Sequence, residues 1–300
     1  MARIAIVGVG AIGGVIAALL QQTERHELVL CVRRPMGMLT VETPTGPVVV
    51  RAKVVTDPAD APAVDWVLIA TKAYDVAGAA KWLGKLRTEG APVAVLQNGV
   101  EHRERFAPYV PLDSILPVVV DCPAERQAPE KIRQRGVMHL KAPEGEMGQA
   151  FVELFAGSAA DAVVVPDFTT VAWRKLCHNA AGVLPALLLQ PSGVLRGEAI
   201  GEVALQIVRE CAAVGRAEGA RLEDGVAEAV LGAYRAAPAD SINSLQADRM
   251  AGRPMEIDAR NGVIVRLGKK HGVPTPCNEM AVALLETMVQ KNVSTSSVTA

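Results

Sequence analysis

Apolar and polar positions follow two different patterns along the 300-residue chain. Up to about residue 166, short apolar runs end in polar loops and are separated by stretches with helical spacing, a pattern typical of repeated strand–helix units. The runs that most resemble strands are residues 3–7, 27–32, 65–70, 92–97, 114–120, 136–142 and 161–166. The pattern predicts an α/β domain over residues 1–166.

The spacing of apolar residues changes from about Asp167 onward, and strand-like runs give way to long amphipathic stretches. These stretches have the apolar periodicity of helices packed on one face. We expect helices near residues 168–189, 198–218, 223–234, 241–251, 255–271 and 277–291. Residues 167–300 are therefore predicted to form a second, all-α domain.

Composition narrows the functional classes. Thirty-one basic and thirty-two acidic residues give a net charge of −1, so the chain has no general attraction for nucleic acid or for an anionic membrane. Five scattered cysteines without a CxxC pair indicate a reducing compartment, and the five histidines show no metal-binding spacing, so no metal is expected. Four glycines interrupt the apolar run 4–20, which disfavours a signal peptide or membrane span. We expect a cytoplasmic protein.

A glycine-rich turn follows the first predicted strand. Gly8, Gly10 and Gly13 match GxGxxG between a strand and a helix, the setting in which this motif binds a dinucleotide. The glycines permit a tight turn and close approach of the pyrophosphate, while Ala11 and Ile12 open the helix whose N–H groups face the phosphates. The sequence predicts a Rossmann-type domain; the alternative is a purely structural glycine turn.

The second predicted strand ends in Arg33 and Arg34, and no carboxylate occurs from residue 28 to residue 41. An acidic residue at this point would bind the ribose 2′-hydroxyl of NAD, whereas guanidinium groups suit a 2′-phosphate. NADP(H) is the predicted cofactor. Taken alone, each arginine is also compatible with an exposed loop charge.

Two further loops carry polar residues where strands end. Lys72 follows the apolar part of 65–75, and Asn98 follows that of 92–102. Ligands of open α/β sheets collect at the carboxyl ends of strands, so both residues are candidate contacts for cofactor or substrate. The alternatives are a surface charge at a helix start for Lys72 and an ordinary Asn98-Gly99 turn.

The first helix of the second domain, "VAWRKLCHNAA" at 171–181, is apolar except for a few positions. Lys175, His178 and Asn179 have the spacing that places them on one helix face. Such a face is either a solvated edge or the wall of a ligand site.

Several of these segments together resemble one family, the 2-dehydropantoate 2-reductases, also called ketopantoate reductases. The segments are "GVGAIGG", the arginine after the second strand, "TKAYD", "LQNG", "WRKLCHNA" and "SLQADRMAGRPMEID" at 244–258, and they span nearly the whole chain. The resemblance implies NADPH-dependent reduction of 2-dehydropantoate to pantoate, a step of pantothenate and coenzyme A biosynthesis.

The resemblance also implies roles for individual residues. Lys175 corresponds to the general acid for the substrate carbonyl, and Glu256 to the glutamate that holds the reacting oxygen or its partner. Asn179 and Ser244 correspond to substrate ligands. These roles are chemically sensible, because hydride delivery to a ketone builds an alkoxide that a nearby lysine can both stabilise and protonate.

Other residues gain or lack a role in the same way. Lys72 and Asn98 correspond to positions near nicotinamide and substrate, and Asn98 offers an amide to the substrate. His178 receives no role and is expected to be a spectator. Glu256 has an alternative explanation, because a carboxylate near Pro254 at the start of a helix is favoured by the helix dipole.

The chain departs from the family pattern at two points. A second family asparagine is replaced by Val183 or Leu184, and an asparagine three residues before Ser244 is replaced by Ser241, with Asn243 as a candidate to compensate. A lost hydrogen-bond partner can change substrate preference by orders of magnitude.

Three functional hypotheses follow from this comparison of residues. The first is a 2-dehydropantoate reductase, the second a relative that reduces another small 2-oxo acid, and the third a non-catalytic NADPH-binding sensor. Lys175 and Glu256 favour an enzyme, because a sensor has no need of a proton donor. A homodimer is compatible with apolar helices such as 198–218.

Overall fold

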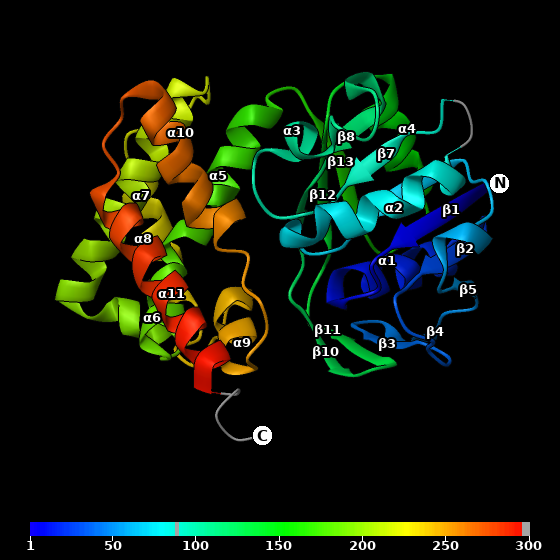
Figure 1. Cartoon of the computed structure of the whole chain (residues 1–300), viewed down its shortest axis with the longest axis horizontal. Coiled ribbons are helices and arrows are strands. Elements are labelled where there is room, and N and C mark those ends of the chain that lie inside the picture. Colours follow the sequence, from blue (N-terminus) through cyan, green and yellow to red (C-terminus); the bar gives the residue numbers. More distant parts are fainter. Residues whose placement is uncertain (88–89, 296–300) are drawn as a thin grey trace. The chain divides into compact units, whose positions relative to one another are not determined.

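The structure is a computed structural model that describes residues 1–87 and 90–295, with side chains described to Met288 at the C-terminal end. The chain divides into two compact units, Met1–Phe168 and Thr169–Ala300, and each is described by itself (Figure 1). Unit 1 is an α/β domain and unit 2 is helical, as the sequence pattern predicts.

Unit 1 contains a parallel sheet with the strand order β5-β2-β1-β6-β7-β8. Its strands are β1 (Ala2–Val7), β2 (His26–Cys31), β5 (Lys53–Val55), β6 (Trp66–Ile69), β7 (Val93–Val95) and β8 (Ile115–Pro117). The helices are α1 (Ala11–Gln22), α2 (Val76–Leu86), α3 (His102–Phe106) and α4 (Glu146–Leu154), with 3₁₀ turns at Pro58–Asp60, Ala73–Asp75 and Leu112–Ser114. Helices cover both faces of the sheet, which explains why its strands are continuous apolar runs.

Alternate residues of β1 enter two separate apolar cores. Ile4 and Ile6 belong to the cluster that includes α1, whereas Ala5 and Val7 belong to the cluster that includes α2 and α3. This follows from the two-residue period of a strand. Because β1 is the middle of three paired strands, its carboxyl end delivers Gly8 to the centre of one sheet edge.

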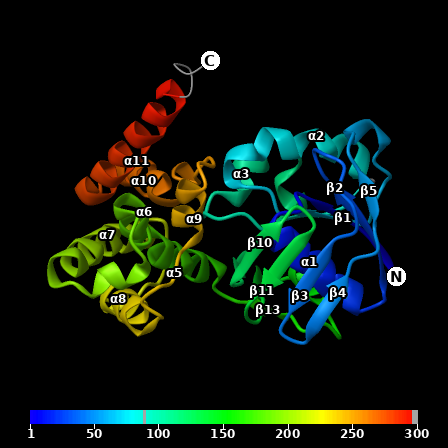
Figure 2. The ribbon, with the colours of Figure 1, turned by 90° about the horizontal axis from the view of Figure 1, so that it is seen from below.

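Two smaller sheets complete unit 1. One has the order β10-β11-β3-β4 and the other β13-β12-β9. Their strands are β3 (Thr40–Thr43), β4 (Gly46–Val49), β9 (Val119–Asp121), β10 (Ala124–Ala128), β11 (Lys131–Gln134), β12 (His139–Pro143) and β13 (Asp161–Val165). The four-stranded sheet packs on α1, which lies between it and the large sheet (Figure 2). The sequence pattern missed the β10–β11 hairpin, because residues 124–134 are mostly polar.

Unit 2 contains the predicted helices with altered boundaries. They are α5 (Phe168–Ala181), α6 (Val183–Leu188), α7 (Glu198–Ala217), α8 (Val226–Ala236), α9 (Ser244–Met250), α10 (Val263–His271) and α11 (Pro276–Thr295). A 3₁₀ turn at Ser192–Arg196 and a π-helix at Asp258–Gly262 lie between them.

Two predicted helices are wrong in detail. The helix predicted at 168–189 is interrupted at Gly182, where an added Cβ would lie 2.9 Å from Arg260 Nη2 and 3.0 Å from Tyr234 Oη. The helix predicted at 255–271 begins only at Asp258, so Glu256 precedes it in a non-helical segment. Tertiary contacts, which local spacing does not report, surround Gly182.

Neither a membrane-crossing helix nor a cluster of metal ligands occurs among the described residues. None of the helices there has both the length and the apolar character that crossing a bilayer requires. Within the same part of the chain, no group of three or more His, Cys, Asp or Glu side chains is arranged to hold a metal ion.

Candidate active site

The glycine-rich loop in unit 1 requires its glycines for different reasons. Gly8 has φ +91°, and a Cβ there would lie 2.6 Å from the Thr71 side chain. A Cβ on Gly13 would lie 2.1 Å from the carbonyl oxygen of Gly8. A Cβ on Gly10 would meet nothing within 4 Å, so the loop is open on that side. Helix and strand therefore pack closely while one side of the loop stays accessible.

Helix α1 begins beside this open side. Its N-cap residue, Gly10, provides no side-chain cap, and the first turn contains no acidic residue. The first N–H groups of a helix, here including those of Ala11 and Ile12, have no acceptor within the helix and attract an anion. The open face at Gly10 and these donors fit the diphosphate of a dinucleotide.

Arg33 and Arg34 follow β2 and are exposed. The Arg33 side chain is 85% exposed, and its Nη1 lies 3.6 Å from Asp75 Oδ2. An exposed pair at this distance contributes little to stability, so the guanidinium can exchange its partner for a phosphate at small cost. The sequence analysis missed Asp75, which reaches Arg33 from the loop after a different strand.

Lys72 and Asn98 are held by a shared hydrogen-bond network. The Gln97 side-chain amide donates to Thr71 Oγ1 (2.9 Å) and to the Lys72 carbonyl (3.2 Å), so it joins the loops after β6 and β7. His102 Nε2 donates to the Gln97 carbonyl (2.8 Å), and burial lowers the pKa of His102 to about 4. Lys72 and Asn98 themselves are half-buried. The network places both residues at the same sheet edge as the glycine loop.

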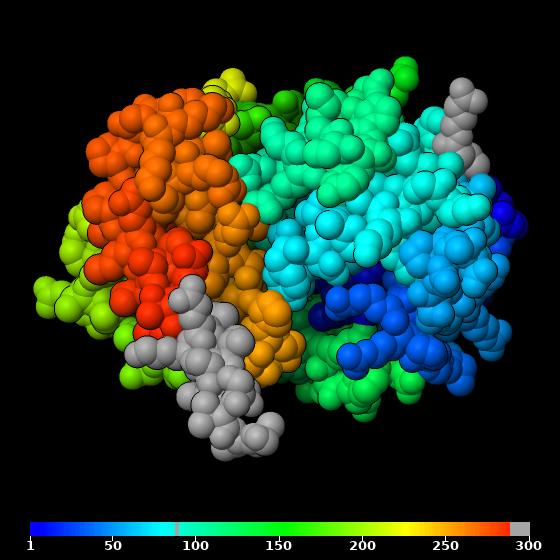
Figure 3. All heavy atoms as spheres, viewed as in Figure 1, coloured from blue at the N-terminus to red at the C-terminus, as the bar shows by residue number. Residues whose placement is uncertain are grey.

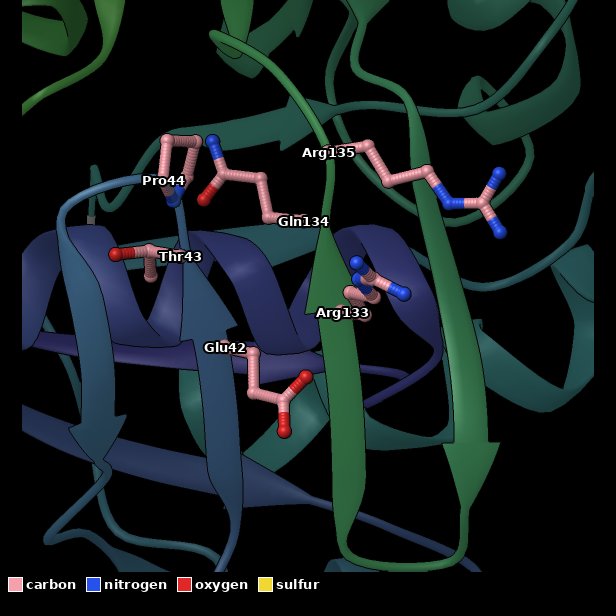
Figure 4. A pocket seen from close by; sticks show the side chains of 6 residues that line it. All are labelled: Glu42, Thr43, Pro44, Arg133, Gln134 and Arg135. Atoms are coloured by element: carbon pink, nitrogen blue, oxygen red, sulfur yellow. The ribbon is translucent and has the colours of Figure 1, made fainter.

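A surface hollow lies elsewhere in unit 1, on the four-stranded sheet. Its lining residues are Glu42, Thr43, Pro44, Arg133, Gln134 and Arg135 (Figure 4). None of the predicted site residues belongs to it, so it is not part of the candidate active site.

In unit 2, the polar face of α5 is present as predicted. Lys175, His178 and Asn179 are half-buried, while their neighbours Leu176 and Cys177 are fully buried. The His178 ring stacks on Tyr234, with ring centroids 4.6 Å apart and an interplanar angle of 8°. His178 therefore has a packing role, and Lys175 and Asn179 are the other two polar side chains of this face.

Side chains from three other segments bind the carbonyl groups at the end of α5. The last carbonyls of a helix lack partners within it, and the break at Gly182 leaves those of α5 available. The bonds run from Tyr234 Oη to His178 O (3.0 Å), Arg260 Nη2 to Asn179 O, Asn261 Nδ2 to Ala180 O (3.2 Å) and Asn243 Nδ2 to Gly182 O (2.9 Å). We refer to these four donors and four acceptors as the α5 hub. The hub ties α8, α9 and the π-helix to the end of α5.

Both polar atoms of the Asn243 side chain make hydrogen bonds within unit 2. Its Nδ2 donates to Gly182 O, while its Oδ1 caps α9 by accepting the N–H of Gln246 (3.0 Å). Ser244, the next residue, is exposed at the first position of α9. Asn243 thus positions Ser244 relative to α5.

Glu256 is 4% exposed and lies near a buried cation. Arg260, which is 2% exposed, interacts electrostatically with Tyr234, Glu256 and Asp248, and burial lowers its pKa. A buried carboxylate needs such a partner, because desolvation of an unpaired charge costs several kcal/mol. Glu256 lies two residues before the π-helix, so the dipole of that helix stays an alternative explanation for the carboxylate. Sequence reasoning missed Arg260, Tyr234 and Asn261.

The missing family asparagine has an apolar replacement. Val183 is 0% exposed and Leu184 is 7% exposed. Both residues pack in the core of unit 2, so the polar contact is absent from this position.

The amino-acid sequence matches the two halves of one family. The model described as "Ketopantoate reductase PanE/ApbA" matches residues 4–146, and that of its C-terminal part matches residues 167–289. The chain is 48% identical over 285 residues to the 2-dehydropantoate 2-reductase of Caulobacter vibrioides, covering 95% of this chain and 98% of that protein. The chain belongs to the ketopantoate reductase family.

Solved structures have the same fold. A PanE/ApbA family ketopantoate reductase from Ralstonia eutropha JMP134 superposes with a TM-score of 0.87 at 31% identity, covering 96% of this chain and 99% of that one. A D-mandelate dehydrogenase with NADH and anilino(oxo)acetate superposes with a TM-score of 0.87 at 22% identity, with coverage of 96% and 99%. The second likeness, at 22% identity, concerns the fold alone.

Proposed function

We propose that the protein reduces 2-dehydropantoate to pantoate with NADPH as cofactor. The observation that carries the proposal is the 48% identity to a 2-dehydropantoate 2-reductase along 95% of the chain. Residues 1–166 would hold NADP(H), and residues 167–300 would supply the substrate and catalytic groups.

The cofactor residues lie along one edge of the large sheet in unit 1. The first N–H groups of α1 and the open side of Gly10 take the diphosphate, and Arg33 takes the 2′-phosphate. Lys72 and Asn98 lie toward the nicotinamide end, held by Gln97. When bound, NADPH supplies the hydride.

Lys175 is the proposed general acid. Its ammonium group donates a proton to the carbonyl oxygen of the substrate as negative charge develops there. Asn179 lies one turn farther along α5 on the same face and offers its amide to the substrate. Ser244 offers a hydroxyl to the substrate carboxylate, and Glu256 orients the reacting oxygen or the group that holds it.

The α5 hub supports these roles. It fixes the peptide groups of His178 and Asn179, so the polar face of α5 has little freedom to rotate. It also fixes Asn243, the residue before Ser244. Rigid positioning of this kind is needed because a misplacement of about 1 Å can cost about 100-fold in rate.

Reduction of another small 2-oxo acid is a second candidate. The observation that favours it is the buried pair Val183 and Leu184 at the position of a family asparagine. NADPH oxidation measured with 2-dehydropantoate and a panel of 2-oxo acids decides between the candidates. Preference for 2-dehydropantoate, with pantoate as product, supports the proposal; preference for another acid supports the second candidate, and no oxidation with any acid contradicts both.

A homodimer is also part of the proposal. Met280 and Leu284 are one turn apart on α11 and are 55% and 44% exposed, so they offer an apolar contact surface. Light scattering coupled to gel filtration tests the proposal, and a monomer mass at high protein concentration would contradict it.

A further inference from the structure

Arg126 on β10 reaches across unit 1 to the glycine-rich loop. Its Nη2 donates to the carbonyl oxygen of Val9, the residue between Gly8 and Gly10, and its Nη1 donates to the carbonyl oxygen of Pro129. Val9 and Arg126 are separated by 117 positions in the sequence. The contact therefore comes from the packing of the β10–β11 hairpin and not from the dinucleotide-binding motif itself.

Strand alternation explains why Arg126 faces the loop. In the antiparallel pair, Arg126 lies opposite Ile132, and cross-strand partners share one face of a sheet. Ile132 is fully buried against α1, with its Cδ1 2.1 Å from the position of a Cβ on Gly14. Arg126 therefore lies on the face that packs on α1. Arg133, one residue from Ile132, is exposed on the other face and lines the surface hollow (Figure 4).

The hairpin also contacts the loop that carries the paired arginines. Glu130, in the turn between β10 and β11, accepts the N–H of Gly37 at 2.7 Å, four residues after Arg33. In the space-filling view, dark-blue atoms from the first part of the chain are visible between the brighter blue of the segment after β2 and the green of the hairpin (Figure 3). The hairpin thus touches both loops that the proposed cofactor needs.

The Arg126 guanidinium lacks an anionic partner among the described residues. Within the described part of the chain, no carboxylate lies within ion-pair distance of this guanidinium. Its two hydrogen-bond acceptors are neutral carbonyl oxygens. Partial burial of the group lowers its pKa, so the cation loses hydration without gaining a counter-ion. An anion bound at the glycine loop would provide that counter-ion.

We propose that Arg126 is a cofactor-binding residue that binds the diphosphate of the dinucleotide from the side opposite α1's first turn. The inference rests on the proposed function, because it assumes that a dinucleotide binds here. The diphosphate is common to NADPH and NADH, so Arg126 strengthens the binding of both, whereas Arg33 acts on the 2′-phosphate of NADPH alone.

Two substitutions separate this role from a structural one. Arg126→Gln keeps a side-chain donor for the Val9 carbonyl but removes the charge, and Arg126→Lys keeps the charge. Dissociation constants for NADPH and NADH are measured by fluorescence titration on the purified protein, without substrate. Arg133→Gln is the matched control, because it removes the same charge from the opposite face of the same hairpin.

We expect Arg126→Gln to weaken the binding of both nucleotides at least about tenfold, which corresponds to about 1.4 kcal/mol, and by the same factor, because it removes a charge-assisted hydrogen bond to the diphosphate. Arg126→Lys should recover most of this loss, and Arg133→Gln should bind like the unmodified protein. Unchanged affinities in Arg126→Gln would overturn the inference, as would a loss confined to NADPH or a loss that lysine does not reduce.

The same titration distinguishes a failure of the proposed function from a failure of the proposed role of Arg126. If the unmodified protein binds neither nucleotide, the proposed function itself fails. If it binds NADPH and Arg126→Gln binds equally well, only the role of Arg126 fails.

Discussion

The glycine loop of unit 1 and the α5 hub of unit 2 build their functional sites in opposite ways. At the loop, backbone groups would face the ligand; a Cβ on Gly8 or Gly13 would clash, and the side of Gly10 is open. At the hub, side chains from α8, α9 and the π-helix bind backbone carbonyls, so that Lys175 and Asn179 are held in place. A site of the first kind is determined by a few residues that are close in the sequence, whereas a site of the second kind depends on contacts between distant segments.

The largest expected effect belongs to unit 2. Lys175→Ala should lower kcat by about 10²- to 10⁴-fold, the range for a positioned general acid, with NADPH affinity unchanged. Steady-state kinetics and a nucleotide titration on the same preparation measure both quantities. His178→Ala is the control on the same face, and it should leave kcat nearly unaltered. Comparable losses in the two variants would mean that α5 acts through its structure and not through the Lys175 proton.

We expect the free energy of unfolding to depend on pH through His102, which binds the loop after β7 in unit 1. His102 has a pKa of about 4 in the folded protein, below its ordinary value of 6.5, because burial disfavours the charged ring. Its neutral form therefore stabilises the fold above about pH 6.5, and this stability is lost as the pH falls toward about 4, by roughly 3 kcal/mol in total.

Urea denaturation at several pH values measures this dependence. His102→Gln removes the titrating group and should make the fall in unfolding free energy between pH 6.5 and pH 4 shallower. Equal slopes in the variant and the unmodified protein would exclude His102 as the cause.

A smaller effect should be specific to one cofactor. We expect NADPH to bind at least about tenfold more tightly than NADH, and Arg33→Ala to narrow the difference by weakening NADPH alone, because a charge-assisted contact contributes about 1.5 to 3 kcal/mol. Isothermal titration with both nucleotides provides the comparison. Equal affinities in the unmodified protein would contradict the assignment, and an effect of Arg34→Ala alone would move the contact by one residue.

The smallest effect concerns stability at the α5 hub. Tyr234→Phe removes the donor to His178 O and should lower the unfolding free energy by about 1 kcal/mol. Burial raises the pKa of Tyr234 to about 12, so the hydroxyl stays a donor throughout the neutral range. Chemical denaturation measures the change, and a variant as stable as the unmodified protein would show that the hub does not depend on this bond.

The two regions differ in how far sequence alone describes them. The strand, glycine turn and helix that begin unit 1 follow from apolar runs and from Gly8, Gly10 and Gly13, because these features are local. Asp75 and Arg126 do not, because their partners, Arg33 and Val9, are distant in the sequence.

In unit 2, periodicity located the helices, and spacing placed Lys175 and Asn179 on one face. The break at Gly182 and the non-helical position of Glu256 were not predictable in this way. Both lie near Arg260, a buried cation that is distant from Gly182 in the sequence. The roles of the site residues themselves came from a family resemblance and stay predictions.

The central claim is that residues of unit 1 bind NADPH and that Lys175 of unit 2 supplies the proton. Its most direct test is a pair of measurements on two variants, Arg33→Ala and Lys175→Ala. Each is examined for NADPH affinity by titration and for the single-turnover rate of NADPH oxidation with saturating NADPH and 2-dehydropantoate. We predict weaker NADPH binding with a near-normal rate for Arg33→Ala, and normal binding with a rate lowered at least about 100-fold for Lys175→Ala. A normal single-turnover rate in Lys175→Ala, or a loss of NADPH binding equal to that of Arg33→Ala, would contradict it.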